Sequence, residues 1–578
     1  MNIQLKILRQ PENMFFRLPY DMIMPIYMYF YTVYPMKKIL LGGATAAVVA
    51  VAMLGSPYYL GSKARQSLQQ QHDILADTFF IEIDKTKSNY QQGWFTSTET
   101  IVFRFSPNVL ANLSKQIPNN VRVVLEKPIT LVNHVKHHPF AAGITPVRAV
   151  VDTEFQYDPE VKKTLARFFG EQTPLTVRNI IKLNGDGDMS VKVAPFDYEE
   201  LSGIKLNWNG LDGTVSYQDG YAQYTTHFVM PAFKAQLADK GSLNFEQLDL
   251  SSITESSQDG KTALGSSNTT LGKFEATWQE GIDYHIQLNE LINMVTDLQI
   301  GAFINPTGTV PPSSIRVENL SYTTQSYATQ TQEPEAGFIN TQGKFAFAKL
   351  HYGDKQYGPL NIDVVAEHLH TDSLNALKTK WQALANEPVV ASDASSPAVA
   401  EEQNQKWLAA VRNEGAGVFT NNPVFKVQAF DFTTPQGHIK AKGSLKFTDL
   451  TQADLNDSKL LIAKMNADLE LDVSQSLIED FSITQTSHFF TTEDPNNAQE
   501  QQEIRDTIKL LINQSIDSMA QEGYLSKDNG AVKTHLLVAN NQITLNNKPF
   551  QTQTNEDLFA NLEDENAVPP QPESASAP

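Results

Sequence analysis

The chain has 578 residues, of which 41% are hydrophobic and 19% are charged, a composition that excludes a disordered chain and a polytopic membrane protein and allows more than one domain. Its 45 Lys and Arg against 65 Asp and Glu give a net charge of -20, which repels phosphate backbones, so we expect no nucleic-acid partner. Cysteine is absent, which excludes disulfides, thiol nucleophiles and Cys-ligated metals.

The first 35 residues have the character of an added segment. Pro19, Pro25 and Pro35 break any long helix. Met36, followed by two lysines and an apolar run, is typical of a natural start. We therefore predict that residues 1–35 are a non-native extension or, if they belong to the protein, a short cytoplasmic segment.

An uncharged apolar run follows at residues 39–60. At about 1.5 Å per residue it is long enough to cross a hydrocarbon core of about 30 Å. Two lysines before it favour a cytoplasmic N-terminus, and Tyr58 and Tyr59 at its far end have the place of an interfacial aromatic belt, although Pro57 alone also explains the end of a helix. A cleaved signal peptide is the alternative. We expect a retained single-pass anchor.

Strand signals dominate the rest of the chain, which we predict to be a β-rich periplasmic region over residues 79–550. Residues 61–78 are polar and predict a linker or a helix. Residues 79–83, 100–105 and 121–125 are then rich in β-branched and aromatic side chains that partly alternate with polar ones. This pattern predicts an α+β fold of long twisted antiparallel sheets with a few packing helices, preceded by one transmembrane helix.

Two hairpins are predicted farther along. Apolar residues alternate at positions 204–208 and are followed by Asn209-Gly210, a strong turn signal. Residues 424–447 alternate on both sides of a turn at positions 435–437. Phe430 and Phe432 fall out of phase with the preceding residues, which indicates a bulge.

Two segments show helical spacing instead, at residues 374–384 after a cap at Asp372 and at residues 504–519 before a cap at Gly523. Residues 386–403 are dominated by Ala, Ser, Pro and Glu and predict an exposed insertion. The tail at residues 551–578 is acidic and predicts disorder.

Histidines are the strongest candidate metal ligands. His134, His137 and His138 form the densest group, but Lys136 lies among them and no acidic residue accompanies them. His368 and His370 share one face of a predicted strand, without an identifiable third ligand. We therefore favour surface histidines over a metal site in both segments.

Sequence motifs for catalysis are absent. Gly260-Lys261-Thr262 has the end of a phosphate loop, but Glu255 occupies the position of its first glycine. No Gly-x-Ser-x-Gly, His-Glu-x-x-His or Gly-x-Gly-x-x-Gly motif occurs. We therefore predict no catalytic residues, no cofactor site and no metal site.

Four motifs occur in the order of one known family. They are residues 89–97 (Asn-Tyr-Gln-Gln-Gly-Trp-Phe-Thr-Ser), 206–213, 357–360 and 543–550. Together they resemble the YdgA/YihF-like bacterial envelope proteins, a family with a domain of unknown function. The resemblance implies an inner-membrane anchor, a periplasmic domain and no established catalytic residues. We expect Trp94 and Phe95 of the first motif to contribute to the core.

The sequence thus favours a non-enzymatic protein with a structural or interaction role, held in the inner membrane through residues 39–60 and folded in the periplasm. Its partner would be an envelope protein or a lipid. The alternative is a curved sheet whose groove binds or transfers a lipid or another hydrophobic ligand. An envelope hydrolase with a carboxylate pair is the third hypothesis.

Overall fold

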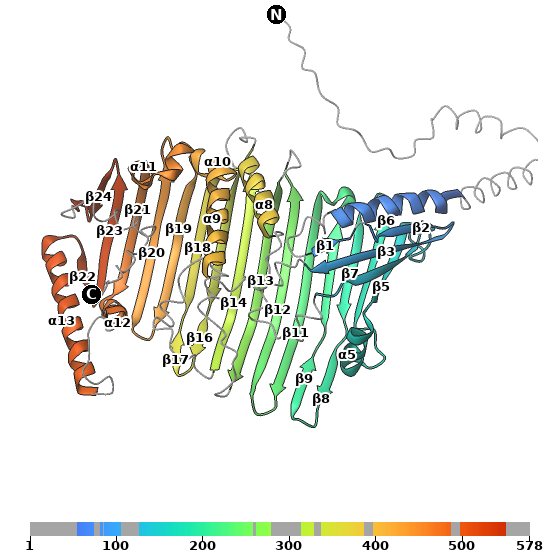
Figure 1. The fold of residues 1–578 in the computed structure, drawn as a ribbon, viewed down its shortest axis with the longest axis horizontal. Coiled ribbons are helices and arrows are strands. Elements are labelled where there is room, and N and C mark those ends of the chain that lie inside the picture. The colour runs from blue at the N-terminus through green and yellow to red at the C-terminus, as the bar shows by residue number, and fades with distance from the viewer. Residues whose placement is uncertain are drawn as a thin grey trace, which may run out of the picture.

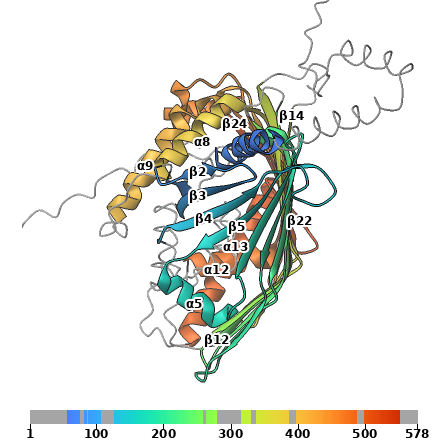
Figure 2. The ribbon, with the colours of Figure 1, turned by 90° about the vertical axis from the view of Figure 1, so that its right-hand side faces the viewer.

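The computed structural model describes residues 55–73, 81–84, 86–105, 126–257, 262–278, 314–328, 337–385, 397–486 and 498–550. Within these residues, all 25 strands belong to one sheet and pair in antiparallel fashion. The sheet runs the length of the molecule and gathers its helices on one side (Figures 1 and 2). The predicted β-rich fold with a few helices is confirmed.

Several predictions from the sequence concern residues outside this described set, namely 1–35, 39–54, 121–125 and 551–578.

Strands follow one another through the sheet almost in chain order. The N-terminal strands are β1 (Ile81–Ile83), β2 (Asn89–Gln92), β3 (Thr96–Phe105), β4 (Ile129–Lys136), β5 (Val147–Gln156), β6 (Leu175–Lys182), β7 (Gly187–Val193), β8 (Phe196–Glu199), β9 (Ile204–Trp208) and β10 (Leu211–Tyr217). The longest strands come next and are β11 (Gln223–Leu237), β12 (Gly241–Ser256), β13 (Ala263–Trp278) and β14 (Ser314–Ala328).

The C-terminal part continues the same sheet. Its strands are β15 (Phe338–Phe347), β16 (Lys349–Tyr352), β17 (Lys355–Tyr357), β18 (Leu360–His370), β19 (Val424–Thr434), β20 (Gly437–Phe447), β21 (Met465–Ser474), β22 (Ser526–Asp528), β23 (Ala531–Ala539), β24 (Gln542–Leu545) and β25 (Lys548–Pro549). Short strands close both ends of the sheet, β1 and β2 at one end and β24 and β25 at the other. Short edges expose few unpaired backbone groups, which limits pairing with another sheet.

Helices pack on the sheet at separate places. The N-terminal helix covers residues 55–73, and the others are α5 (Pro159–Phe169), α8 (Thr371–Ala385), α9 (Pro397–Asn413), α10 (Ala416–Thr420), α11 (Ser458–Ala463), α12 (Gln475–Thr486) and α13 (Ala498–Glu522). Short 3-10 turns lie at η1 (Asp219–Tyr221) and η2 (Ala453–Asn456). None of these described helices is long and apolar enough to cross a membrane.

The N-terminal helix begins inside the predicted anchor. Pro57 and Leu60 are buried, and Ala64 and Leu68 of the same helix pack with Val135, a residue of β4. The last residues of the apolar run therefore belong to the folded part of the chain, and the polar segment after it is helical up to residue 73.

A crease crosses the long strands at one level of the sheet. At this level the strands leave the regular pleat at Ala194-Pro195, Asn209-Gly210, Pro231, Gln247, Gly272, Asn319, Ala348 and Gly358-Pro359. On alternate strands the crease residue has a positive φ, namely Gly210 (88°), Gln247 (58°), Asn319 (53°) and Gly358 (106°). One extra residue at the same level in neighbouring strands keeps their pairing in register.

The crease reverses the alternation of side chains along each strand, because the extra residue moves the next side chain to the other face. Residues three apart across the crease therefore point to the same face. Val317 and Leu320 on β14 both pack against one core cluster, which also includes Phe347 and Leu350. That apolar face continues through the crease although the sequence pattern changes phase.

One predicted hairpin is wrong. Asn209-Gly210 does not join two paired strands, because β9 and β10 lie end to end and both pair with β11. A Cβ at Gly210 would lie 3.0 Å from the carbonyl oxygen of Val193 on the neighbouring strand. The glycine serves a close backbone approach at the crease instead of a chain reversal.

The second predicted hairpin is confirmed. β19 pairs with β20 around a turn at residues 435–436, and its register shifts between Val427 and Phe430, as expected for a bulge. The two predicted helices are α8, which starts at Thr371, and α13, which ends before Gly523 (φ 76°). Residues 397–403 of the predicted insertion begin α9, and residues 386–396 lie outside the described chain.

We expect Gly358→Ala to destabilise the protein more than Gly143→Ala. Both glycines have a similar φ, 106° and 108°, so each substitution costs about 1–2 kcal/mol of backbone strain. Only at Gly358 would the new Cβ lie 2.7 Å from a backbone oxygen, that of Ala348, whereas Gly143 has nothing within 4 Å. The midpoint of urea denaturation, followed by circular dichroism, measures the difference. Equal midpoints would contradict a tightly packed crease.

Candidate functional site

Two rows of apolar side chains cross the helix-bearing face on either side of the crease. The first row contains Phe196, Trp208, Phe233, Phe245, Phe274, Val317, Leu350 and Tyr357, each directly opposite the next. The second row contains Val193, Leu211, Met230, Leu248, Leu271, Leu320, Phe347 and Leu360. Directly paired side chains share one face of a sheet, so the first row is continuous, and the second row is paired step by step from Met230 to Leu320.

Aromatic rings touch along the first row. The ring centroids of Trp208 and Phe233 are 6.0 Å apart, those of Phe233 and Phe245 are 6.5 Å apart, and those of Phe245 and Phe274 are 5.0 Å apart. Farther along, Tyr357 stacks at 6.2 Å on Phe432, a fully buried residue of β19. These contacts connect neighbouring members of the first row.

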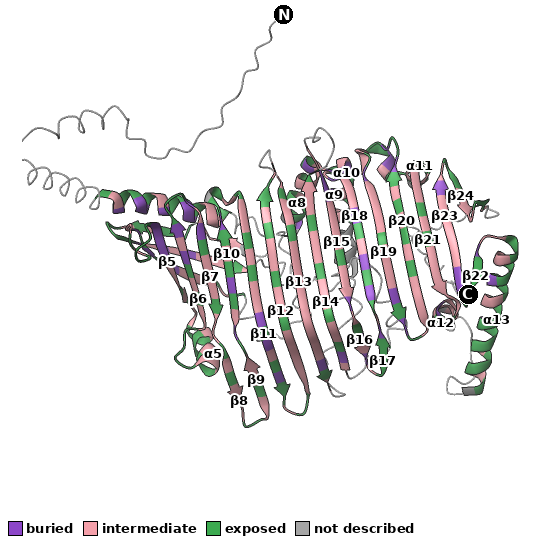
Figure 3. Cartoon of the chain, turned by 180° about the vertical axis from the view of Figure 1, so that it is seen from behind, coloured by how far each residue is buried: buried purple, intermediate pink, exposed green. Residues whose placement is uncertain are grey.

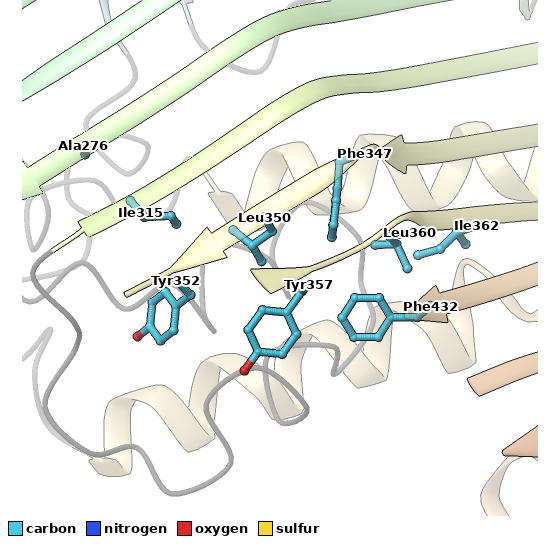
Figure 4. Packing of buried hydrophobic residues seen from close by; sticks show 9 residues of the cluster. All are labelled: Ala276, Ile315, Phe347, Leu350, Tyr352, Tyr357, Leu360, Ile362 and Phe432. Carbon is cyan, nitrogen blue, oxygen red and sulfur yellow. The ribbon is translucent and has the colours of Figure 1, made fainter. Parts of the chain in front are cut away.

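The members of the first row are not equally buried. Leu350, Tyr357 and Phe432 are buried, and Figure 4 shows their side chains on the same side of the sheet. Helices pack over the flanks, with α5 on β8, α8 and α10 on β18, and α12 on β20 and β21. On strands β11 to β14 between them, Phe233, Phe245 and Phe274 are only half-buried. The middle of the first row is therefore less completely buried than its end at Leu350 and Tyr357.

The opposite face of the same strands is charged. The Lys234 ammonium lies 3.6 Å from a carboxylate oxygen of Glu246, and the Lys273 ammonium lies 2.6 Å from one of Glu275. These four side chains alternate along their strands with members of the first row and therefore point to the opposite face. Figure 3 shows the long strands from that side, with mostly half-buried and exposed residues and a few buried ones. The sheet is therefore amphipathic, which favours an apolar partner on the helix-bearing face.

A second group of notable residues lies under the N-terminal helix. The Ser97 hydroxyl lies 2.8 Å from Nε2 of His137, whose Nδ1 donates to the carbonyl oxygen of Pro57 at 2.7 Å. This is the arrangement of a nucleophile, a base and an orienting acceptor. His137 is 0% exposed and Ser97 is 4% exposed, so no substrate can reach them. The pair instead fixes the start of the helix to the sheet.

A buried carboxyl group completes this group. Glu99 accepts a hydrogen bond from the Asn133 amide at 2.9 Å and lies 3.6 Å from the ring of His72 on the N-terminal helix. Burial raises the pKa of Glu99 and lowers the pKa of His72. Both shifts favour the neutral forms, because burial outweighs the Asn133 hydrogen bond and the Arg65 charge at Glu99 and the Asp73 charge at His72.

The structure separates the histidines that the sequence grouped together. His134 is exposed and lies 3.1 Å from Glu154, whereas His137 is buried and His138 is half-buried. His368 stacks at 4.0 Å on Phe338, and His370 lies 2.9 Å from the Ser373 hydroxyl. In the part of the chain that the structure describes, no three His, Cys, Asp or Glu side chains come together as metal ligands. Residues 258–261 of the rejected phosphate loop lie outside it.

The sequence contained a signal for the two rows that the alternation test missed. Pairs of apolar residues three apart recur in successive strands, such as Met230 and Phe233, then Phe245 and Leu248. This spacing interrupts strict alternation, as the bulge predicted near Phe430 also does. Trp94 and Phe95, predicted to lie in the core, are 53% and 45% exposed, so that prediction is wrong.

We expect Glu99→Gln to stabilise the protein more at about pH 8 than at about pH 4. Burial raises the pKa of Glu99 above its usual 4.5, so the folded state binds this proton more tightly than the unfolded state does. The stability that the proton contributes is lost as pH rises from below 4.5 through the raised pKa. Glutamine keeps an acceptor for Asn133 and removes the buried charge. Thermal melting at both pH values measures the effect, with exposed Glu154→Gln as control. A gain that does not depend on pH would refute a buried charge here.

Comparisons with known proteins agree with the bacterial origin that the motifs indicate. The family model "Bacterial protein of unknown function (DUF945)" matches residues 36–553. No match is found among curated proteins or among solved structures. The match covers most of the chain, including every strand that the structure describes. The chain therefore belongs to this family of bacterial proteins of unknown function.

Proposed function

We propose that the chain is a membrane-tethered protein of the bacterial envelope that acts by binding a hydrophobic ligand, and not by catalysis. The observation that carries this proposal is the pair of apolar rows, which cross the helix-bearing face without a charged member. Apart from Met230, which is buried, their members on strands β11 to β14 are half-buried. A face of this kind binds chains without polar groups.

The dimensions of the first row favour an extended ligand. From Phe196 to Tyr357 it crosses seven steps between paired strands. At about 4.8 Å per step the row is about 34 Å long. Aromatic rings at close spacing suit an acyl chain, which gains contact with each ring that it crosses. The proposed ligand class is therefore a lipid or another long apolar molecule.

The tether places this face beside a source of lipid. The apolar run at residues 39–60 leads into the N-terminal helix, and contacts of His137 with Pro57 and of Glu99 with His72 hold that helix on the sheet. A purely structural or interaction role remains the second candidate, favoured by the length of the single sheet and its closed edges.

We expect Phe274→Lys to reduce the lipid that copurifies with the protein in mild detergent by about tenfold. A lysine ammonium in the first row would lose its water when an acyl chain covers it, at a cost of well over about 1.4 kcal/mol. Thr277→Lys is the matched control, since Thr277 is exposed on the opposite face of the same strand. Quantitative lipid mass spectrometry of both variants measures the difference. Wild-type protein without lipid, or equal loss in both variants, would refute the binding face.

The tether has its own test. We expect the full chain to fractionate with the inner membrane, and trypsin added to spheroplasts to cleave residues beyond 61 in intact cells. Chain that is protected until the cells are lysed would place the folded part in the cytoplasm and contradict the proposal.

A further inference from the structure

Large apolar side chains gather on the loops at one end of the N-terminal strands and on the first turn of the N-terminal helix. Seven of them are strongly exposed, and we call them the apolar tip: Tyr58 51%, Tyr59 56%, Trp94 53%, Phe95 45%, Phe140 46%, Ile144 94% and Leu183 50%. Loop tips usually carry small or polar residues, and an exposed apolar group of this size marks an interaction surface.

Strand register places these loops at the same end of the sheet. Thr96 pairs with Lys136, so the β2–β3 turn and the β4–β5 loop are neighbours. Val147 pairs with Lys182, which brings the β6–β7 turn alongside. Direct contacts agree, since the amide of His137 donates to the carbonyl oxygen of Phe95 at 2.9 Å.

The N-terminal helix begins at this tip. The rings of Tyr58 and Trp94 are 5.8 Å apart, and the Gln92 amide donates to the carbonyl oxygen of Tyr58 at 2.9 Å. Figure 2, which faces this end of the molecule, shows the helix above strands β2 to β5. The chain that enters the tip at residue 55 is therefore the apolar run that starts at residue 39.

Backbone geometry presents the aromatic pair at the apex of its turn. The amide of Gly93 donates to the carbonyl oxygen of Thr96 at 3.0 Å, and a Cβ at Gly93 would lie 2.4 Å from that oxygen. Only glycine allows so tight a turn. Trp94 and Phe95 then stand at its outer end, where burial in the sheet is impossible.

We propose that the apolar tip docks into the interface of the bilayer that holds the anchor. Trp and Tyr are favoured at that depth, because each combines an apolar ring with a polar group that stays hydrated. This inference rests on the proposed tether, which fixes the tip at the membrane surface. It adds that the folded part lies on the membrane instead of hanging from a flexible stalk, with the sheet held in one orientation.

The absence of cysteine allows a direct test. Ile144→Cys and Leu201→Cys each place one nitrobenzoxadiazole label on the full chain, reconstituted in vesicles of phosphatidylethanolamine and phosphatidylglycerol. Leu201 is the matched control, because it is fully exposed in the β8–β9 turn, at the lower ends of the strands in Figure 1. We expect the label at residue 144, and not at residue 201, to be several-fold brighter than in detergent-free water and to be quenched by brominated acyl chains.

Additional outcomes separate the tip from the tether. Replacing Trp94 and Phe95 by serine should return the label at residue 144 to water, while the protein resists an alkaline carbonate wash as before. If the label at residue 144 is as dim as the one at residue 201, in protein that resists the wash, the docking is overturned and the tether is left intact. Release by the wash overturns the tether. If the label at residue 144 brightens in native membranes but not in pure lipid vesicles, a protein partner covers the apolar tip, and this result also overturns the docking.

Discussion

One extra residue per strand, at one level of a long sheet, is the constraint on which the structure depends. Without it, strict alternation would carry the apolar side chains of β11 to β14 to opposite faces above and below Pro231, Gln247, Gly272 and Asn319. Because neighbouring strands take the extra residue together, the hydrogen-bonded register is kept and one face stays apolar along its whole height. The bend that results makes this face the one that gathers the helices (Figure 2).

A single sheet of this length buries only part of its apolar surface against itself. The flanking helices complete separate cores, with α8, α9 and α10 near β18 and α12 and α13 near β21. Between these flanks the first row remains half-buried, with Phe245 and Phe274 in direct contact. The same apolar row thus supplies stability where helices cover it, and where they do not it forms the face that we propose as a binding surface. At the N-terminal end, the buried His137 contact to Pro57 links this face rigidly to the segment that we propose as anchor.

Local patterns in the sequence predicted the elements whose signals are local. The hairpin of β19 and β20, its bulge near Phe430 and helix α13 with its cap at Gly523 follow from spacing and turn residues. The hairpin predicted at Asn209-Gly210 is wrong, because the same dipeptide suits a hairpin turn and a crease. Only the pairing of β9 and β10 with β11 decides between the two. Trp94 and Phe95 were wrongly predicted to lie in the core because hydrophobicity alone does not distinguish a core from an exposed apolar surface. The spacing of three between apolar residues was visible in the sequence, but only its repetition in paired strands gives it meaning.

A structure of the full chain in lipid nanodiscs, by electron cryomicroscopy, tests the account most directly. The account predicts elongated density along Phe233, Phe245 and Phe274 that no protein atom explains, with Trp94 at the level of the lipid headgroups. Protein side chains that seal this row from end to end, or a sheet whose tip points away from the disc, would contradict it.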